Sequence, residues 1–274
     1  MPINKGQKKC EVLLEQDREI QQGKIVVSAG DAITARLVEQ AGFDGIWISG
    51  FEASARLGLA DNGSITMTEM LNIARPIVDS VNIPVWVDVD TGYGNFKRTV
   101  REFEKIGVTG ICVQDDYPHL KQNSLWGGKS PLMEMEEFSK KINVERKKLK
   151  IIARTEAIIR GEGIDVARNR LDHYRRKGGA DILLPHTRSI KEVLFVQDLI
   201  GDFAIVPTKF PQATNNKLFA MGYSMVIWAN QTERVKIKST RDALKILKDK
   251  DRSFDIDKNL SATLDEMKGL TPDD

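Results

Sequence analysis

Eight short apolar runs alternate with longer amphipathic segments along this chain, and that alternation constrains the fold more than any other feature. The runs are rich in β-branched and aromatic residues, as buried strands are, and they cover residues 24–30, 44–50, 83–90, 108–116, 149–157, 180–187, 202–208 and 223–230. Helical patterns occupy 31–42, 66–81, 96–107, 134–149, 164–179, 190–201, 215–222 and 238–249. Strands that alternate with helices pair in parallel through right-handed crossovers.

Eight such units predict an α/β protein of the (β/α)8, or TIM barrel, class. A chain of 274 residues suits one barrel, so we expect residues 1–274 to form a single domain. An extra N-terminal helix is expected at roughly 7–22, and a C-terminal helical extension with a helix at roughly 259–268. A doubly wound open sheet is the alternative, but eight units favour closure. Left-handed glycine caps are expected where helices end, at Gly42, Gly107, Gly178, Gly201 and Gly222.

The bulk properties exclude several classes of partner. Basic and acidic residues number 41 and 39, a net charge of +2, which gives no reason to expect nucleic acid or a membrane surface. Cys10 and Cys112 lie far apart without metal-type spacing, which fits a reducing compartment. The N-terminus lacks an apolar signal-peptide core, and no apolar stretch could span a bilayer. We therefore expect a soluble, cytoplasmic globular protein.

Polar residues gather where the predicted strands end. In (β/α)8 barrels the carboxyl ends of the strands carry the chemistry, whereas stability is served at the opposite face. The residues at these ends are Ser49 and Gly50; Asp88 and Asp90; Gln114, Asp115 and Asp116; Arg154 and Glu156; His186; Thr208 and Lys209; and Asn230. The sequence therefore predicts an active site at this rim.

Three positions on the rim have a definite chemical interpretation. Asp88 and Asp90 stand at i and i+2, so an extended chain would point both to one side, where they could hold Mg²⁺ or Mn²⁺; capping the next helix is the alternative. Arg154 suits capture of a phosphoryl or carboxylate group, unless it is consumed by an ion pair with Glu156 or Asp88. The pattern alone leaves His186 equally open to a structural and a catalytic role.

Four motifs on the expected elements carry a family resemblance. They are "VDVDTGYGN" at 87–95, the Lys121-x-Asn123-Ser124 core after the fourth strand, "VPTKF" at 206–210 and "SMVIWAN" at 224–230. With them, nearly the whole chain resembles the phosphoenolpyruvate mutase/isocitrate lyase superfamily, and most closely its phosphoenolpyruvate mutase branch.

The resemblance implies an isomerase that interconverts phosphoenolpyruvate and phosphonopyruvate, a C–P bond-forming step of phosphonate biosynthesis. It assigns Mg²⁺ to Asp88, with Asp90 in contact through water. Gln114, which stands in place of a carboxylate of the family, is expected in the surrounding shell. The residues it implies for catalysis are Asp61, Lys121, Asn123, Arg154 and His186, and those for substrate binding are Ser49, Gly50, Phe51 and Ser124. It also implies a mobile loop after the fourth strand that closes over the substrate, and a homodimer or homotetramer that exchanges a helix.

Other chemistries remain open within the superfamily. Lyases of the isocitrate lyase type use a cysteine in the loop after the fourth strand, whereas residues 120–128 read "LKQNSLWGG" and contain none. Phosphonopyruvate hydrolase shares the metal site and is harder to separate. A binding protein with a degraded site is disfavoured because Asp88, Arg154 and His186 are all present.

The fourth strand departs from the family pattern. It usually ends Glu-Asp-Lys and here ends Gln114-Asp115-Asp116, and Asn230 is followed by Gln231 rather than histidine. We therefore expect weaker or differently balanced Mg²⁺ binding, or a modified substrate such as a carboxylated phosphoenolpyruvate.

Overall fold

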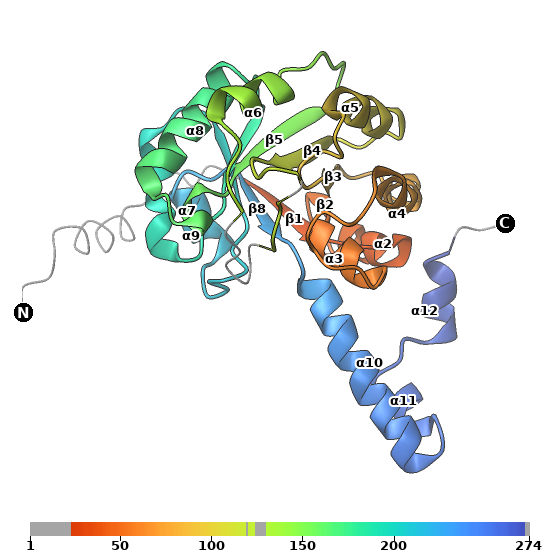
Figure 1. Cartoon of the computed structure of the whole chain (residues 1–274). Helices are drawn as coiled ribbons and strands as arrows, with labels where there is room; N and C mark the ends of the chain where they lie inside the picture. Colours follow the sequence, from red (N-terminus) through yellow and green to blue (C-terminus); the bar gives the residue numbers. More distant parts are fainter. Residues whose placement is uncertain (1–22, 119, 124–129, 272–274) are drawn as a thin grey trace, which may run out of the picture.

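Eight parallel strands close into a barrel in the computed structural model, which describes residues 23–118, 120–123 and 130–271 (Figure 1). The strands pair in chain order and β8 returns to pair with β1. They are β1 (Lys24–Ser28), β2 (Gly45–Ile48), β3 (Val85–Asp88), β4 (Gly110–Gln114), β5 (Lys150–Thr155), β6 (Ile182–Pro185), β7 (Asp202–Ile205) and β8 (Met225–Trp228). The predicted (β/α)8 barrel is confirmed.

Helices surround the barrel and link its strands. They are α2 (Ala32–Gln40), α3 (Gly50–Arg56), α4 (Met67–Ser80), α5 (Phe96–Lys105), α6 (Met135–Ile142), α7 (Ala157–Arg160), α8 (Ile164–Arg176), α9 (Asn215–Ala220) and α10 (Gln231–Lys250). The short helices α3 and α7 each begin within two residues of a strand end. They bring the segments after β2 and β5 over the mouth of the barrel.

The structure corrects three predictions about these connections. Residues 190–201 form two 3₁₀ turns, η2 (Ile190–Glu192) and η3 (Leu194–Asp198), not one α-helix. The hydroxyl of Tyr223 donates to the Val193 carbonyl at 3.0 Å, at the junction of the two turns. The helix expected at 134–149 ends at Ile142, because the backbone N–H groups of 147–149 donate to Glu104 on α5. The left-handed glycine after α8 is Gly179, with φ of 65°, and not Gly178.

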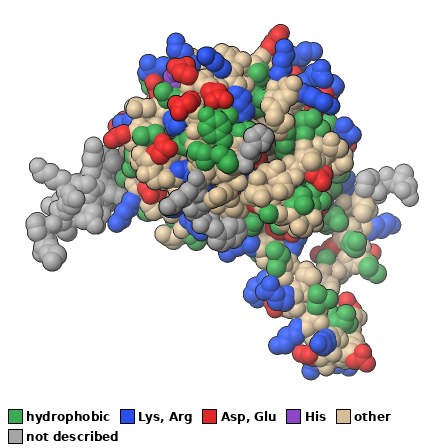
Figure 2. Space-filling view, viewed as in Figure 1, with side chains coloured by type: hydrophobic (Ala, Val, Ile, Leu, Met, Phe, Trp, Pro, Cys, Tyr) green, Lys and Arg blue, Asp and Glu red, His purple; other side chains and the backbone are tan. Residues whose placement is uncertain are grey.

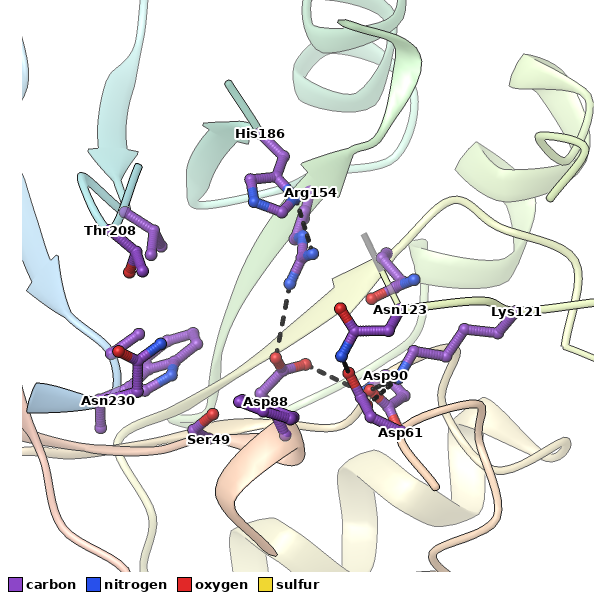
Figure 3. Close-up of a pocket in the computed structure, with 15 residues that line it drawn as sticks. Ser49, Asp61, Asp88, Asp90, Lys121, Asn123, Arg154, His186, Thr208 and Asn230 are labelled. Carbon is purple, nitrogen blue, oxygen red and sulfur yellow. Dashed lines mark hydrogen bonds and ion pairs between the residues drawn. The ribbon is translucent and has the colours of Figure 1, made fainter. Parts of the chain in front are cut away.

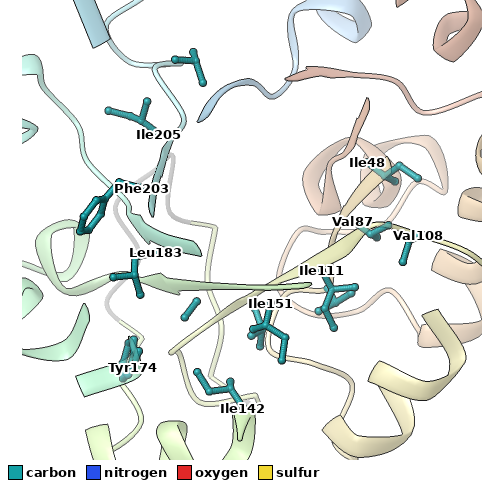
Figure 4. Packing of buried hydrophobic residues seen from close by; sticks show 14 of the residues in the cluster. Ile48, Val87, Val108, Ile111, Ile142, Ile151, Tyr174, Leu183, Phe203 and Ile205 are labelled. Carbon is teal, nitrogen blue, oxygen red and sulfur yellow. The ribbon is translucent and has the colours of Figure 1, made fainter. Parts of the chain in front are cut away.

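Alternating side chains divide the core into two layers. Inward residues such as Trp47, Trp86 and Cys112 fill the barrel interior. Outward residues pack against the helices; in Figure 4, Val87, Ile111, Ile151 and Leu183 from the strands lie in one layer with Ile142 and Tyr174 from the helices. The filled interior closes the barrel below, so a ligand can enter only at the rim.

The C-terminal helices leave the barrel. In Figure 1, α10 projects away from it, and α11 (Phe254–Asn259) and α12 (Leu264–Gly269) follow. Arg36 on α2 donates to the carbonyl of Leu270 at 2.8 Å, which ties the end of α12 back to the barrel. The predicted C-terminal helix is thus present, beginning at Leu264 rather than near 259. The helix predicted at 7–22 lies outside the described residues, and none of the described helices is long and apolar enough to cross a membrane.

Candidate active site

A pocket opens at the carboxyl ends of the strands, as the rim of polar residues predicts (Figure 3). The side chains that line it come from β2 to β8 and from the loops after β2 and β4. They are Trp47, Ser49, Phe51, Asp61, Asp88, Asp90, Gln114, Lys121, Asn123, Arg154, His186, Val206, Thr208, Ala229 and Asn230.

Asp88 and Asp90 converge at the floor of the pocket, although not as two residues of one extended strand. Asp88 ends β3, whereas Asp90 lies in the following turn with φ of 50°, a left-handed conformation that aspartate tolerates. The Asp90 N–H donates to Asp88 Oδ1 at 3.1 Å. A Cβ on Gly50 would come within 2.9 Å of Asp90 Oδ1, so any other residue where α3 begins would have to displace this carboxylate. Burial raises the pKa of both carboxyls, that of Asp90 to about 6.

Lys121, Asn123 and Asp61 meet on one wall. Lys121 Nζ lies 2.5 Å from Asp61 Oδ1 and 2.7 Å from Asp90 Oδ1, and Asn123 Nδ2 donates to the other oxygen of Asp61. Burial alone would lower the pKa of Lys121, but Asp90 and Asp61 more than offset this and raise it. Two loops about 60 residues apart in the chain are thereby joined through charge-assisted hydrogen bonds.

Arg154 and His186 form the opposite wall together with Glu156. Arg154 Nε lies 2.5 Å from Glu156 Oε1, its Nη1 3.5 Å from Asp88 Oδ2, and its Nη2 2.8 Å from His186 Nδ1. Burial would raise the pKa of Glu156, but Arg154 and His186 hold it well below its ordinary value. Burial lowers the pKa of His186, which favours the neutral ring. The ion pairs considered as an alternative role for Arg154 are therefore formed, and yet the guanidinium still lines the pocket.

The residues that end β4 diverge. Gln114 lines the pocket, and its Nε2 donates to Asp116 Oδ2 at 2.6 Å. Asp115 turns away and is fully buried, accepting from the hydroxyls of Thr155 and Tyr174. Cys112 lies in the barrel interior with no exposed surface, and burial raises its pKa well above the ordinary value.

Ser49 and Phe51, for which the sequence predicts substrate binding, line the pocket, whereas Ser124 lies outside the described residues. Ser49 also caps α3, because its hydroxyl accepts from the Glu52 N–H.

The sequence assigns no individual role to five lining residues, although two of them, Thr208 and Asn230, are among the polar residues that predicted the rim. Trp47, Val206 and Ala229 contribute apolar surface, and Thr208 and Asn230 contribute polar groups. Thr208 Oγ1 and Asn230 Oδ1 are buried without a hydrogen-bond partner in the described part of the chain. Figure 3 shows both residues across the pocket from Lys121 and Asn123. Their positions at the ends of β7 and β8 and within the 206–210 and 224–230 motifs marked both residues in the sequence, but neither signal indicated a role.

The donors at the pocket floor fit a divalent cation of the Mg²⁺ type. Asp88 and Asp90 supply two carboxylates, and Asp90 Oδ2 is buried without a hydrogen-bond partner among the described residues. No cluster of three or more His, Cys, Asp or Glu side chains able to hold a metal occurs within residues 23–118, 120–123 and 130–271. Mg²⁺ is commonly held by one or two carboxylates while water and substrate oxygens complete its octahedron.

A family model described as phosphoenolpyruvate phosphomutase matches residues 18–248 of the chain. The chain belongs to the phosphoenolpyruvate phosphomutase family. A crystal structure of phosphoenolpyruvate phosphomutase from Streptomyces platensis subsp. rosaceus is 33% identical, with a TM-score of 0.87 over 96% of this chain and 94% of that one.

Members of this family with other activities are as similar in sequence. Phosphonopyruvate hydrolase of Variovorax sp. (strain Pal2) is 35% identical over 79% of each chain, and 2,3-dimethylmalate lyase of Eubacterium barkeri is 32% identical over 83% of each. Membership in the family thus places the protein among enzymes that include mutases, a hydrolase and lyases, and the choice among them depends on the pocket itself.

Proposed function

We propose that this protein is a phosphoenolpyruvate mutase that interconverts phosphoenolpyruvate and phosphonopyruvate. The observation that carries the proposal is the placement of Arg154 and His186 across the pocket from Lys121 and Asn123, above the carboxylates of Asp88 and Asp90 (Figure 3). A phosphoryl group in transfer spreads its charge over three oxygens, so enzymes stabilise it with donors and cations placed in advance. Asn123, Arg154 and His186 supply such groups.

The metal and the cationic side chains share the same carboxylates. Asp88 and Asp90 would hold Mg²⁺, with Gln114 in the shell around it, and Mg²⁺ would neutralise the enolate and carboxylate oxygens of pyruvate. In the structure Asp88 pairs with Arg154 and Asp90 with Lys121. A cation held by Asp88 and Asp90 would compete for these carboxylates, and the Arg154 guanidinium, held by Glu156, would then face the phosphoryl group.

The remaining residues orient and enclose the substrate. Ser49, Gly50 and Phe51 hold its carboxylate where α3 begins. Glu156 holds Arg154, whose Nη2 donates to His186 Nδ1 at 2.8 Å, so the neutral ring carries its proton on Nε2 and can donate it to the substrate. Asp61 holds Lys121 and Asn123 in place, and closing this wall excludes the water that would hydrolyse the transferring group.

Two observations bear on the alternatives. Cys112 is the one cysteine of the described chain, and its burial in the barrel interior keeps it from substrate, which disfavours a cysteine-dependent lyase. The unpartnered polar atoms of Thr208 and Asn230 favour a second candidate, a mutase acting on a larger, carboxylated phosphoenolpyruvate, because an added polar group would meet them.

Phosphorus NMR separates these functions. The protein is incubated with Mg²⁺ and phosphonopyruvate, and an Arg154→Met variant serves as the inactive control. Formation of phosphoenolpyruvate supports the mutase, and release of free phosphate identifies the hydrolase. If phosphonopyruvate persists unchanged, the proposal is wrong, and cleavage of 2-methylisocitrate then tests the lyase chemistry.

We further propose the setting in which this enzyme works. The partner is a small phosphorylated or phosphonate 2-oxo acid rather than nucleic acid, and the compartment is the cytoplasm. The assembly is a homodimer or homotetramer formed through the projecting C-terminal helices.

A further inference from the structure

Asp116 and Arg160 form an ion pair that is almost completely buried beside the pocket. Their side chains are 0% and 3% exposed, and Arg160 binds both carboxylate oxygens, with Nε at 3.1 Å from Oδ1 and Nη2 at 2.6 Å from Oδ2. Two apolar residues of similar volume would often stabilise the fold as well as such a pair, because they avoid its desolvation cost. The pair therefore needs an explanation beyond packing.

Arg160 connects two parts of the loop that follows β4. Asp116 lies at the neck of this loop, where it forms an antiparallel bridge with Leu132. Arg160 Nη2 also donates to the carbonyl oxygen of Gln122 at 3.2 Å. Gln122 stands between Lys121 and Asn123, the two residues that contact Asp61. Arg160 thus ties the backbone of segment 121–123, which carries Lys121 and Asn123, to Asp116 at the neck of the same loop.

Asp116 also selects the orientation of the Gln114 amide. An ionised carboxylate only accepts hydrogen bonds, so Asp116 binds Nε2 of Gln114 and leaves Oε1 as the amide atom available to the pocket. A cationic side chain at position 116 would bind Oε1 and present the amide hydrogens instead, which repel a metal ion. Gln114 and Asp116 are therefore a matched pair: the anion makes the amide present an oxygen, as a glutamate would.

We propose that Asp116 and Arg160 are positioning residues that hold segment 121–123 against Asp61 and turn Gln114 Oε1 toward Asp88 and Asp90. The first role stands on contacts within the chain. The second role rests on the metal site of the proposed function.

The decisive variant is the double replacement Asp116→Leu/Arg160→Met, which removes both charges together and leaves no buried ion unpaired. Arg160→Lys keeps the charge but loses the forked contact. Arg188→Met is the matched control, because Arg188 Nη2 donates at 2.6 Å to Ile159 in the same helix α7 but is not among the residues that line the pocket.

Trypsin cleavage after Lys121 tests the first role in the intact protein, without metal or substrate. Lys121 is only 6% exposed, so cleavage requires the segment to leave its place. Losing a charged hydrogen bond corresponds to about a 10-fold change in such an equilibrium. We expect cleavage about that much faster in the double variant, an intermediate rate for Arg160→Lys, and the wild-type rate for Arg188→Met. Equal rates in all four proteins would overturn this role.

Binding of Mn²⁺ alone, titrated by electron paramagnetic resonance, tests the second role. Removing a group that orients the shell around a metal weakens binding by about 10-fold or more. We expect that loss in the double variant and not in Arg188→Met, and unchanged affinity would overturn the role of Asp116. Trypsin cleavage and Mn²⁺ binding do not depend on turnover. A negative phosphorus NMR result would therefore refute the proposed reaction and leave both of these tests valid.

Discussion

At the scale of single residues, Asp61 is the group that holds Lys121 and Asn123 together on one wall of the pocket. It accepts from Lys121 at one oxygen and from Asn123 at the other. Asp61→Asn would place an amide hydrogen against one of these donors, while Lys121 would keep Asp90. Losing a preorganised contact in the transition state costs about 100-fold to 1,000-fold in kcat. We expect a loss of that size in phosphoenolpyruvate formation from phosphonopyruvate.

The control for Asp61→Asn is Asp44→Asn. The Asp44 carboxylate accepts from the Ile25 N–H in β1 and is not among the residues that line the pocket. It should leave kcat unchanged. An Asp61→Asn enzyme that loses only substrate affinity, with kcat intact, would show that this wall acts in binding and not in the chemical step.

Glu52 gives the fold a pH dependence. It is 2% exposed, and a contact to the Ser28 hydroxyl only partly opposes the effect of burial on its carboxyl. Burial raises its pKa from 4.5 to about 7, and nearby Glu233 raises it further while Arg56 opposes this. Because the folded pKa exceeds the unfolded one, the carboxyl favours folding fully below about pH 4.5, and this contribution is lost as the pH rises through about 7.

Glu52→Gln removes that titration. One pKa unit corresponds to about 1.4 kcal/mol. The free energy of unfolding of the variant should therefore exceed that of the wild type by up to about 3 kcal/mol at pH 8 and equal it near pH 4.5. Urea denaturation at both pH values measures the difference. The exposed Glu145→Gln serves as the control and should change neither value. If the difference in free energy of unfolding between the wild type and Glu52→Gln is the same at both pH values, the prediction is contradicted.

Strand parity explains which site residues the sequence could identify. Asp88, Arg154 and His186 each follow an inward apolar residue two positions earlier, so their place at the rim follows from the alternation. The partnership of Asp116 with Arg160 does not, because it joins residues 44 positions apart. Asp116 in the sequence is only a charge of unexpected sign, and the structure supplies the partner that makes it compatible with burial.

At the scale of elements, helix α4 fixes the loop that carries Asp61. The loop leads into Thr66, whose hydroxyl accepts from the Glu69 N–H while the Glu69 carboxylate accepts from the Thr66 N–H. Such capping boxes contribute roughly 1 kcal/mol. We expect Thr66→Ala to lower the free energy of unfolding by about that amount in urea. Replacing the exposed Thr68, two residues later, with alanine should change it much less. Alanine has the higher helix propensity, so equal losses in both variants would mean that the cap hydrogen bond is not what distinguishes Thr66.

The same scale shows where pattern reading fails. All eight strands were predicted because the burial of a strand is evident from its own run of apolar residues. The segments 143–149 and 190–201 were misassigned because Glu104 and Tyr223, which are distant in sequence, decide their conformation. Amphipathic spacing indicates only which face of a segment is buried. Contacts to side chains from other elements decide whether that segment forms a helix or a turn.

At the scale of the whole molecule, α10 is a helix of 20 residues with no buried side chain. Ile237, Leu244 and Leu247 are 50%, 61% and 44% exposed and fall on one face of the helix. Ile237 and Leu244 also line a groove between α10 and the barrel, together with Arg56 and Asp31. A projecting helix with an apolar face normally lies against a partner, and the groove beside it offers room for the corresponding helix of a second copy.

We therefore predict that the protein is a homo-oligomer held together by α10, and that Leu244→Glu/Leu247→Glu disperses it. Stable interfaces bury about 1,200–2,000 Å² and concentrate their energy in central apolar residues, so two buried glutamates should shift the assembly to monomers at micromolar concentration. Light scattering coupled to size-exclusion chromatography gives the mass directly. Asp242→Lys, on the opposite face and paired with Lys238, is the control and should keep the wild-type mass. A wild-type protein that elutes at the 30.8 kDa mass of one chain would refute the prediction. An oligomer that survives the double replacement would place the interface elsewhere on the barrel.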